Sequence, residues 1–306
     1  MRDRSMRDLK GYGRTPPDPH WPDGARVAVS FVINFEEGAE MSLSDGDPHN
    51  EKVYEVTDEV TGVPDRCMES HFEYGTKAAW WRIADTLERL GVPATVSACG
   101  KAAERSPWLI RDAVARGHEI SCHGWRWEKH AHMEEAQERE AIARTVRVLT
   151  EIAGHRPVGW HTRSTPSPNT RRLLVEDGGF LYDSDDYSDD LPFLVDVSGR
   201  KHLVIPYSFD TNDMHYHQGF HRFVTARDFA EYTTDAFDTL WAEGERHPKM
   251  MSIGLHLRMI GRPGRIAALD RIVGHMRRKG GVWFATRRRI AEHWLELPDH
   301  VPVAKA

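Results

Sequence analysis

The chain has 306 residues, of which 40% are hydrophobic and 29% are charged, and its formal net charge is -6 at pH 7. This composition is ordinary for a soluble globular protein and, with no long apolar run, excludes a membrane span. The mild negative charge provides no broad basic field for a polyanion, which argues against a nucleic-acid partner.

The first 25 residues differ in composition from the rest. Residues 1–25 are rich in Pro, Gly, Asp and Arg, and the run TPPDPHWPDG cannot sustain a helix or a central strand. We therefore expect an extended N-terminal arm over 1–25 and one catalytic domain over 26–300. The arm lacks the apolar run of roughly 7 to 15 residues that a secretory signal needs. Cys67, Cys99 and Cys122 form no CxxC pair, so we expect reduced thiols and a cytoplasmic protein.

From Ala25 onward, segments typical of strands alternate with segments typical of helices. The run of β-branched and aromatic residues over 25–35 is too apolar for a half-exposed strand and predicts a buried parallel strand. Further strands are predicted over 92–100, 118–124, 156–162, 180–185, 202–209, 249–257 and 281–286. Amphipathic spacing predicts helices, most of them ended by a glycine, over 75–91, 106–117, 133–154, 169–179, 225–245 and 264–280.

About seven alternations of strand and helix predict an α/β fold with a parallel sheet and crossover helices. The sheet is either closed into a barrel or doubly wound. No GxGxxG or GxxxxGK[ST] motif follows any predicted strand, which weakens the nucleotide-binding, doubly wound alternative. We therefore expect a single-domain barrel.

Polar residues follow almost every predicted strand, at the end where parallel α/β proteins bind their ligands. They are Asn34, Glu36, Glu37, His123, Trp125, Arg126, Trp127, His161, Arg163, Asp183, Asp185, Asp186, Asp210, Asn212, Asp213, His256 and Arg258. Each alone has an ordinary structural explanation, such as a solvated turn or a hydrogen-bonded histidine. Because Glu36, Glu37, His123 and His256 share one end of different strands, we expect them to form a site. The histidines of the His-rich segment 210–223 are expected on the surface.

A carboxylate that faces a histidine can act as the base of a hydrolysis, while the histidine acts as the acid. The carboxylate deprotonates water and the imidazole protonates the departing nitrogen. Nearby tryptophans and arginines would suit a flat, polar substrate. A metal held by three protein ligands is the alternative activator, since bound zinc lowers the pKa of water to about 7.

At these positions the sequence resembles the polysaccharide deacetylase superfamily, whose members share a distorted (β/α) barrel of about seven strands. The family motif Thr-Phe-Asp-Asp at the end of the first strand is similar to Asn34-Phe35-Glu36-Glu37. This resemblance implies a catalytic base at Glu36 and a former metal-ligand position at Glu37. The fold that it implies is a distorted (β/α)7 barrel.

Two further family motifs are met incompletely. The motif His-x-x-x-His, whose histidines bind metal in the family, is matched by His123-Gly-Trp-Arg-Trp127. An indole, which cannot coordinate a metal, thus replaces the second histidine. The late Leu-x-His motif is met by Leu255-His256 without the intervening residue, which implies that His256 is the proton donor.

A narrower similarity extends over nearly the whole chain, through the segments ARVAVSFVINFEEGAE, SCHGWRW, RPVGW, HLVIPYSFDTNDM and SIGLHLRMIGRPGR. These look like the branch of the superfamily that contains metal-independent allantoinases and cyclic imide hydrolases. The resemblance implies a homotetramer that opens a cyclic ureide or imide without a metal. If zinc or another divalent metal is bound, the candidate ligands are Glu37, His123 and His130, because a loop could return His130 to Glu37.

We therefore expect an amidohydrolase that opens a small cyclic amide such as a ureide, hydantoin or imide. The expected catalytic residues are Glu36, His256 and His123, and the expected substrate contacts are Glu37, Trp127, Arg163, Arg258 and Asn212. A small-molecule substrate and a homo-oligomer, a tetramer or a dimer, are the expected partners, with no membrane. One alternative is a metal-dependent carbohydrate N-deacetylase, which would need an export signal and an intact histidine pair. The other is a non-catalytic binding protein on an eroded enzyme scaffold.

Overall fold

The fold is built around one curled β-sheet with the strand order β10-β6-β7-β5-β4-β3-β2-β1-β8, and β9 pairs with β1 off this path. The computed structural model describes residues 8–52, 58–217, 222–297 and 303–305. The strands are β1 (Val27–Phe35), β2 (Ala94–Ala98), β3 (Glu119–Cys122), β4 (Gly159–Trp160), β5 (Tyr182–Asp183), β6 (Phe193–Val197), β7 (Arg200–Val204), β8 (Lys249–His256), β9 (Val282–Phe284) and β10 (Val303–Lys305).

Strand β1 is the centre of this sheet, and all nine of its residues are buried. Its whole length to Asn34 pairs with β8 in parallel. Its other edge is shared, because Val27–Val29 pair with β9 whereas Phe31–Phe35 pair with β2. The expectation of a buried parallel strand at 25–35 is confirmed, and the division of its edge lets the sheet curl.

The sheet does not close through regular pairing between β7 and β8. An irregular segment fills that interval, where the N–H of Gly254 donates to the carbonyl of Thr211 at 2.9 Å. The Thr211 hydroxyl in turn donates to the carbonyl of Ser252 at 2.5 Å. The predicted distorted barrel is thus confirmed as an α/β fold with a curled half-barrel sheet, and the irregular segment brings residues 211–213 to the end of β8.

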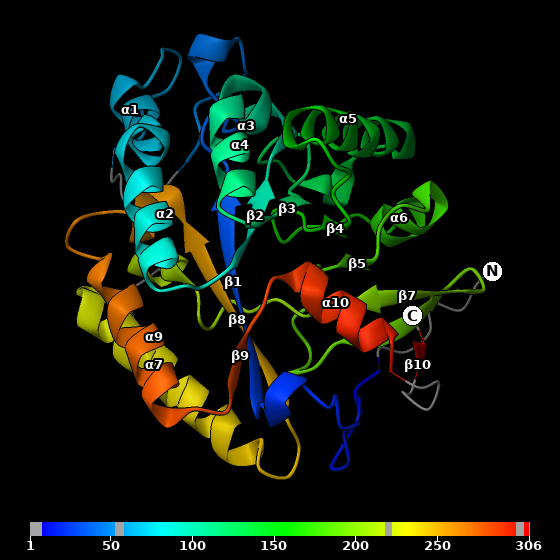
Figure 1. Cartoon of the computed structure of the whole chain (residues 1–306). Helices are drawn as coiled ribbons and strands as arrows, with labels where there is room; N and C mark the ends of the chain where they lie inside the picture. The colour runs from blue at the N-terminus through cyan, green and yellow to red at the C-terminus, as the bar shows by residue number, and fades with distance from the viewer. Residues whose placement is uncertain (1–7, 53–57, 218–221, 298–302, 306) are drawn as a thin grey trace.

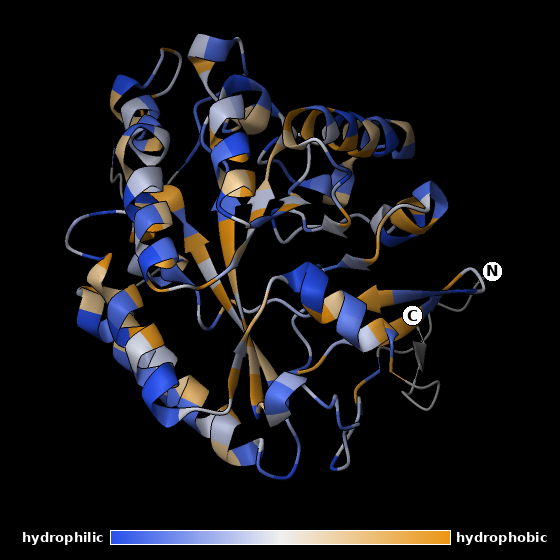
Figure 2. Ribbon diagram, viewed as in Figure 1, coloured by the Kyte–Doolittle hydropathy of each residue, from blue (hydrophilic) through white to orange (hydrophobic). Residues whose placement is uncertain are grey.

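Helices surround the outer face of the sheet (Figure 1), and their apolar stripes face it (Figure 2). They are α1 (Arg66–Tyr74), α2 (Trp80–Arg89), α3 (Gly100–Arg105), α4 (Pro107–Ala115), α5 (Glu135–Ala153), α6 (Thr170–Asp177), α7 (Ala226–Glu243), α8 (Leu257–Ile260), α9 (Ala267–Lys279) and α10 (Arg287–Leu295), with short turns η1 (Pro22–Gly24), η2 (Leu43–Asp45), η4 (His130–His132) and η5 (Asp213–Tyr216). None of the helices within the described ranges has both the length and the apolar composition needed to cross a bilayer.

Several elements differ from those expected from the sequence, since α1, α3, α10, β6 and β10 were not predicted. The helix expected over 75–91 begins earlier, because α1 continues into α2 through the π-helical turn η3 (Gly75–Ala79). The sequence predicted a strand only from residue 202, whereas β7 begins at Arg200 and forms an antiparallel hairpin with the unpredicted β6. Its turn places Ser198 at φ 55° and Gly199 at φ 82°, the two positive values that a tight hairpin turn requires, and Ser-Gly is a turn dipeptide.

Residues 8–25, the described part of the predicted N-terminal arm, pack against the amino ends of β8 and β9. The indole of Trp21 is 2% exposed and donates to the carbonyl of Lys249 at 2.9 Å. Its ring lies 5.6 Å from that of Trp283. The Tyr12 hydroxyl donates to the carbonyl of Pro192 at 2.8 Å. The first seven residues of the predicted arm lie outside the described residues.

The guanidinium of Arg287 connects β8 with the segments that follow β5 and β7, two strands that pair with each other but not with β8. It is buried and donates to the hydroxyls of Ser184 and Ser252 at 2.9 and 2.6 Å. It also donates to the carbonyls of Ile205 and Pro206 at 2.5 and 2.7 Å. These four acceptors come from the segments after β5 and β7 and from β8, so one side chain ties the two sides of the open sheet together.

We expect Arg287→Met to lower the free energy of unfolding by about 3 kcal/mol, because it leaves several buried acceptors without a donor. Urea denaturation followed by circular dichroism measures this loss. Arg288→Met on the same helix is the matched control, since the Arg288 side chain is exposed and its Nε donates to Glu292 at 2.7 Å. Equal stability of the two variants would show that Arg287 does not hold the sheet together.

Candidate active site

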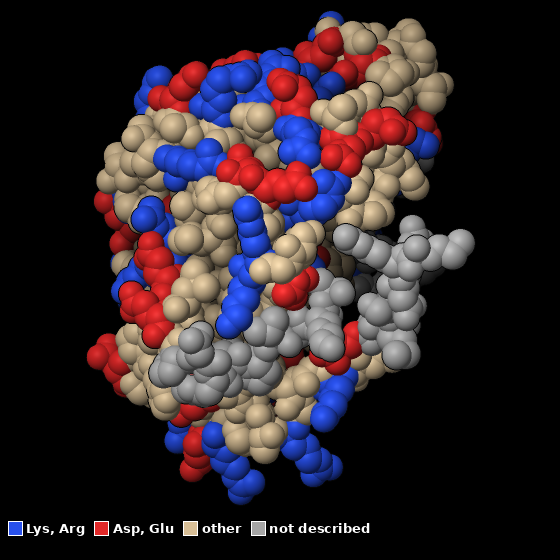
Figure 3. Space-filling view, turned by 90° about the vertical axis from the view of Figure 1, so that its right-hand side faces the viewer, with Lys and Arg blue, Asp and Glu red and all other residues tan. Residues whose placement is uncertain are grey.

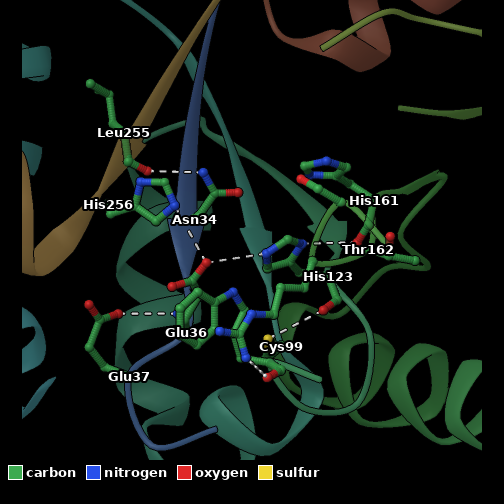
Figure 4. Close-up of polar contacts among 12 residues, drawn as sticks. Asn34, Glu36, Glu37, Cys99, His123, His161, Thr162, Leu255 and His256 are labelled. Atoms are coloured by element: carbon green, nitrogen blue, oxygen red, sulfur yellow. Dashed lines mark hydrogen bonds and ion pairs between the residues drawn. The ribbon is translucent and has the colours of Figure 1, made fainter. Parts of the chain in front are cut away.

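The predicted site residues converge because the carboxyl ends of β1, β3 and β8 lie at one level of the sheet. Asn34, near the end of β1, pairs in register with His256 at the end of β8. The backbone N–H of His123, directly after β3, donates to the carbonyl of Ala98 at the end of β2. Figure 4 shows His123 and His256 on either side of Glu36. The strand-end argument therefore brought these three side chains together correctly.

The carboxylate of Glu36 is the centre of the group and is 1% exposed. Its Oε2 accepts from Nη1 of Arg258 at 2.8 Å. Its Oε1 lies 3.4 Å from Nε2 of His123 and 3.5 Å from Nε2 of His256. Burial raises the pKa of this carboxyl, but Arg258, His256 and His123 outweigh burial and hold the pKa well below its usual value. Glu36 is therefore ionised at neutral pH.

His256 is held in its charged form by a second carboxylate, that of Asp213 on η5. Nδ1 of His256 donates to Oδ1 of Asp213 at 2.7 Å. The other oxygen of Asp213 accepts the backbone N–H groups of His256 and Ile260 at 2.8 and 3.0 Å. Burial lowers the pKa of His256, but the charges of Glu36 and Asp213 outweigh burial and raise the pKa to about 9. The imidazolium thus carries a proton on the Nε2 atom that faces Glu36.

His123 is fixed by a backbone carbonyl. Its Nδ1 lies 2.9 Å from the carbonyl oxygen of His161, and a carbonyl can only accept, so Nδ1 carries the proton. Nε2 is consequently the atom that faces Glu36. The ring of His161, directly after β4, lies 5.1 Å from that of His123, and burial first, then the charge of His123, lowers the pKa of His161 well below its usual value.

A continuous series of contacts joins six side chains, which we name the site ring, and its two ends, Asn34 and His256, are backbone register partners. The hydroxyl of Tyr207 accepts from Nδ2 of Asn34 at 3.0 Å, and its ring lies 4.5 Å from that of His161. From His161 the series continues through His123 and Glu36 to His256. The members of the site ring are Asn34, Glu36, His123, His161, Tyr207 and His256. Each is at most 5% exposed.

Glu37 lies apart from the site ring, on the other side of Arg258. Its Oε2 accepts the backbone N–H of Glu36 at 3.1 Å, and its Oε1 lies 3.4 Å from Nη1 of Arg258. The side chain lies directly against Gly75, where an added Cβ would be 2.5 Å from Oε1. The pKa of Glu37 is raised to about 7. Burial is the main cause; the charge of Arg258 lowers the pKa, and the charge of Glu36 adds to the increase.

Three more of the predicted substrate contacts surround the site ring without belonging to it. The indole of Trp127 packs against Phe72, with the guanidinium of Arg163 3.4 Å above its ring. Arg163 donates to the carbonyl of Trp127 at 3.1 Å and to Glu51 at 3.0 Å. Asn212 caps η5, because its Oδ1 accepts from the N–H of Met214 at 2.9 Å. Its Nδ2 donates to the hydroxyl of Tyr207, a member of the site ring, at 3.2 Å.

The structure does not bring together the candidate metal ligands Glu37, His123 and His130. His130 is buried with Nδ1 3.0 Å from Oε1 of Glu138, on the helix α5. Glu37 is engaged with Arg258, whose guanidinium contributes a positive charge beside both glutamates. No group of three His, Cys, Asp or Glu residues that could hold a metal ion occurs in the part of the chain that the structure describes. The donor set therefore does not fit the metal site formed by the motifs of the wider deacetylase superfamily.

Sequence reasoning had marked Asn34, His161 and Asp213 as strand-end residues but had given none of them a role. Tyr207 was missed, although it follows β7 within a segment that ends at the same edge of the sheet. The expected surface position of the histidines in segment 210–223 is wrong for His217, which is buried, and His215 and His217 both lie outside the site ring. His215 Nε2 lies 2.8 Å from the carbonyl of Phe209, and His217 Nε2 lies 2.9 Å from Arg265. His221 lies outside the described residues.

Comparison with known proteins shows the family to which the chain belongs. The model of the family Polysaccharide deacetylase matches residues 61–180. A protein of Schizosaccharomyces pombe, whose name assigns it provisionally to the polysaccharide deacetylases, is 36% identical over 94% of this chain and 96% of its own.

Two crystal structures are similar over almost their full length. A protein of Pseudomonas aeruginosa PAO1, also assigned provisionally to the polysaccharide deacetylases, has 49% identity and a TM-score of 0.91, covering 97% of this chain and 100% of its own. The Puue allantoinase has 48% identity and a TM-score of 0.92, covering 98% of this chain and 100% of its own. This second likeness supports the allantoinase branch, and the resemblance stated from the sequence is confirmed. The chain is a hydrolase that belongs to the polysaccharide deacetylase family.

Proposed function

We propose that this protein is an amidohydrolase that opens a small cyclic amide, such as a ureide, a hydantoin or an imide, by attack of water. The observation that carries the proposal is the position of Glu36 Oε1, 3.4 and 3.5 Å from the Nε2 atoms of two histidines. A carboxylate and an imidazolium at one point are the base and the acid that hydrolysis of an amide requires. The likeness to the Puue allantoinase supports a cyclic ureide or a related ring as the substrate.

In the proposed reaction, Glu36 accepts a proton from water as the oxygen of that water forms a bond to the amide carbon. His256 then donates its Nε2 proton to the ring nitrogen as the bond between carbon and nitrogen breaks. Asp213 keeps His256 protonated until that step, which suits an amide because an unprotonated amide nitrogen is a poor leaving group. His123, fixed by the carbonyl of His161, orients the water beside Glu36.

The proposed reaction uses no resident metal. The position of the second family histidine holds Trp127, which packs against Phe72 and Arg163. Arg258 supplies a fixed positive charge beside the carboxylate, 2.8 Å from Glu36 Oε2. A cation in a buried site stabilises negative charge that develops during the reaction. In the proposed reaction, the Arg258 guanidinium stabilises the negative charge that develops on the amide oxygen in the transition state.

The proposed partner is a small molecule. All six members of the site ring are nearly buried, which suits a compact ring rather than a polymer. On the face drawn in Figure 3, Lys and Arg side chains are interspersed with Asp and Glu, so that face offers no broad field for a polyanion. Cys99 and Cys122 are buried free thiols, consistent with the expected cytoplasmic location. That location and the homotetramer stay predictions.

A substrate panel tests the proposal. We expect turnover of at least one ring among allantoin, hydantoin, succinimide and a dihydropyrimidine, and none of an acetylated chitin oligosaccharide. In Glu36→Gln, kcat on the same ring should fall by about 10²–10⁴-fold, because the variant lacks the base. The measurement is release of the ring-opened acid by chromatography.

Glu40→Gln is the matched control for this variant. Glu40 is also a buried glutamate, but it bonds the backbone N–H of Gly38 rather than a member of the site ring. Wild-type turnover by Glu36→Gln, or turnover of the acetylated oligosaccharide alone, would contradict the proposed reaction. Thermal unfolding of each variant separates loss of chemistry from loss of fold.

The Asp213–His256 pair predicts the alkaline limb of the pH profile. His256 must be protonated to act as an acid, so kcat should be full below its pKa of about 9 and fall as the pH rises through that value. Asp213→Asn removes a charge that raises this pKa and should move the limb to lower pH by about one to two units. Asp210→Asn, in the same loop but exposed, should leave the limb in place. An unchanged limb in Asp213→Asn would remove His256 from the step.

Chelation tests the proposed independence from metal. After dialysis against EDTA and a metal-free buffer, turnover of the cyclic amide should be unchanged, and elemental analysis should find less than one equivalent of zinc, manganese, iron or cobalt. The reason is that Glu37, His123 and His130 do not converge and Trp127 cannot coordinate. Loss of activity on chelation, with recovery on adding zinc, would establish a metal-dependent hydrolase instead.

A further inference from the structure

The carboxamide of Asn34 has one buried atom without a partner. Its Nδ2 donates to the Tyr207 hydroxyl at 3.0 Å and to the carbonyl of Leu255 at 3.2 Å. Because a backbone carbonyl can only accept, the atom that faces Leu255 must be the amide nitrogen, which fixes the orientation of the group. Oδ1 is therefore the atom that has no hydrogen-bond partner, in a side chain that is only 2% exposed.

The free oxygen belongs to the site ring. Asn34 and Glu36 are two residues apart, so both side chains extend to the same side of β1. Figure 4 shows Oδ1 pointing away from β8, toward the gap between the Asn34–His256 pair and the histidines 123 and 161. Asn34 is also the register partner of His256. The unpaired acceptor thus lies beside both the base and the acid of the proposed reaction.

A buried acceptor is nearly always hydrogen-bonded in a native structure, and an exception indicates a bound water or a ligand. Among the residues that the structure describes, no neighbouring polar group donates a hydrogen bond to Oδ1. The Tyr207 hydroxyl already accepts from Asn34 and Asn212, and His256 Nδ1 donates to Asp213. The donor that Oδ1 lacks would arrive with the substrate.

We infer that Oδ1 of Asn34 accepts a hydrogen bond from the N–H of the scissile amide, and that the substrate is restricted to rings whose reacting nitrogen carries a hydrogen. This inference rests on the proposed function and adds the selectivity of the same site. Held on one side by Asn34, the nitrogen presents its developing lone pair to Nε2 of His256 as the tetrahedral intermediate forms. The family motif has threonine at this position, so asparagine here is a departure with a chemical role.

The experiment compares a ring with its N-methyl derivative. Wild-type enzyme should hydrolyse succinimide with a kcat/KM at least about 10²-fold above that for N-methylsuccinimide, because a site built to accept an N–H rejects the analogue that lacks it. Asn34→Leu, similar in shape but with no acceptor, should lose most of its activity on succinimide and reduce the ratio below about tenfold. If another ring of the panel is the better substrate, that ring and its N-methyl derivative replace the pair.

Tyr207→Phe is the matched variant, because it removes the hydroxyl to which Asn34 Nδ2 donates but keeps Oδ1 and the hydrogen bond from Nδ2 to the Leu255 carbonyl. It should retain the preference for the N–H ring, whatever its absolute rate. Titration calorimetry of the two imides with Glu36→Gln gives a second measurement that does not depend on turnover, and the N–H imide should bind more tightly.

The outcomes separate the two proposals. Hydrolysis of both imides at similar rates by wild-type enzyme would refute the role of Asn34 while leaving the cyclic amidohydrolase intact. A ratio that stays high in Asn34→Leu would also refute it, because the selectivity would then arise elsewhere. Failure to hydrolyse any ring of the panel would instead refute the proposed function itself.

Discussion

The buried ion pair between Glu36 and Arg258 is the interaction on which the site depends. Two ions removed from water each lose several kcal/mol of hydration, which only close contacts can offset. The chain meets this requirement with two cations that are two residues apart, since His256 ends β8 and Arg258 lies in the helix turn that follows. Each has its own carboxylate, Asp213 for His256 and Glu36 for Arg258. The charges of these four groups balance, so an ionised carboxylate and a protonated imidazole can coexist almost without solvent.

Balance of this kind also explains why the proposed chemistry needs no metal. A metal site requires several ligands whose lone pairs converge on one point. Here, those of Glu37 are directed to Arg258 and to the backbone of Glu36, and His130 faces Glu138. A guanidinium is charged at every working pH and cannot be removed by chelation. The positive charge of the site is thus carried by a side chain of the protein. Unlike a catalytic metal, this side chain has no open coordination position that could bind water.

Sequence reasoning predicted what depends on strand periodicity and missed what depends on contacts between distant segments. The sheet, the helices around it and the meeting of Glu36, His123 and His256 follow from strand ends that share one edge. The environments of Arg163 and Asp213 depend on Glu51 and on an irregular segment that fills the interval before β8. No local pattern indicates such partners. Glu37 was expected in one site with Glu36, His123 and His256 but lies apart from them, since neighbouring residues at a strand end tend to face opposite sides.

The contact between Glu37 and Gly75 links two positions that are far apart in sequence. The carboxylate occupies the place that a side chain at 75 would take, and the helix approaches this closely where its backbone widens into the turn Gly75–Ala79. A longer acid at position 37 and the smallest residue at position 75 are therefore complementary in volume. Aspartate at 37 would leave an empty space that the added methyl group of alanine at 75 would fill.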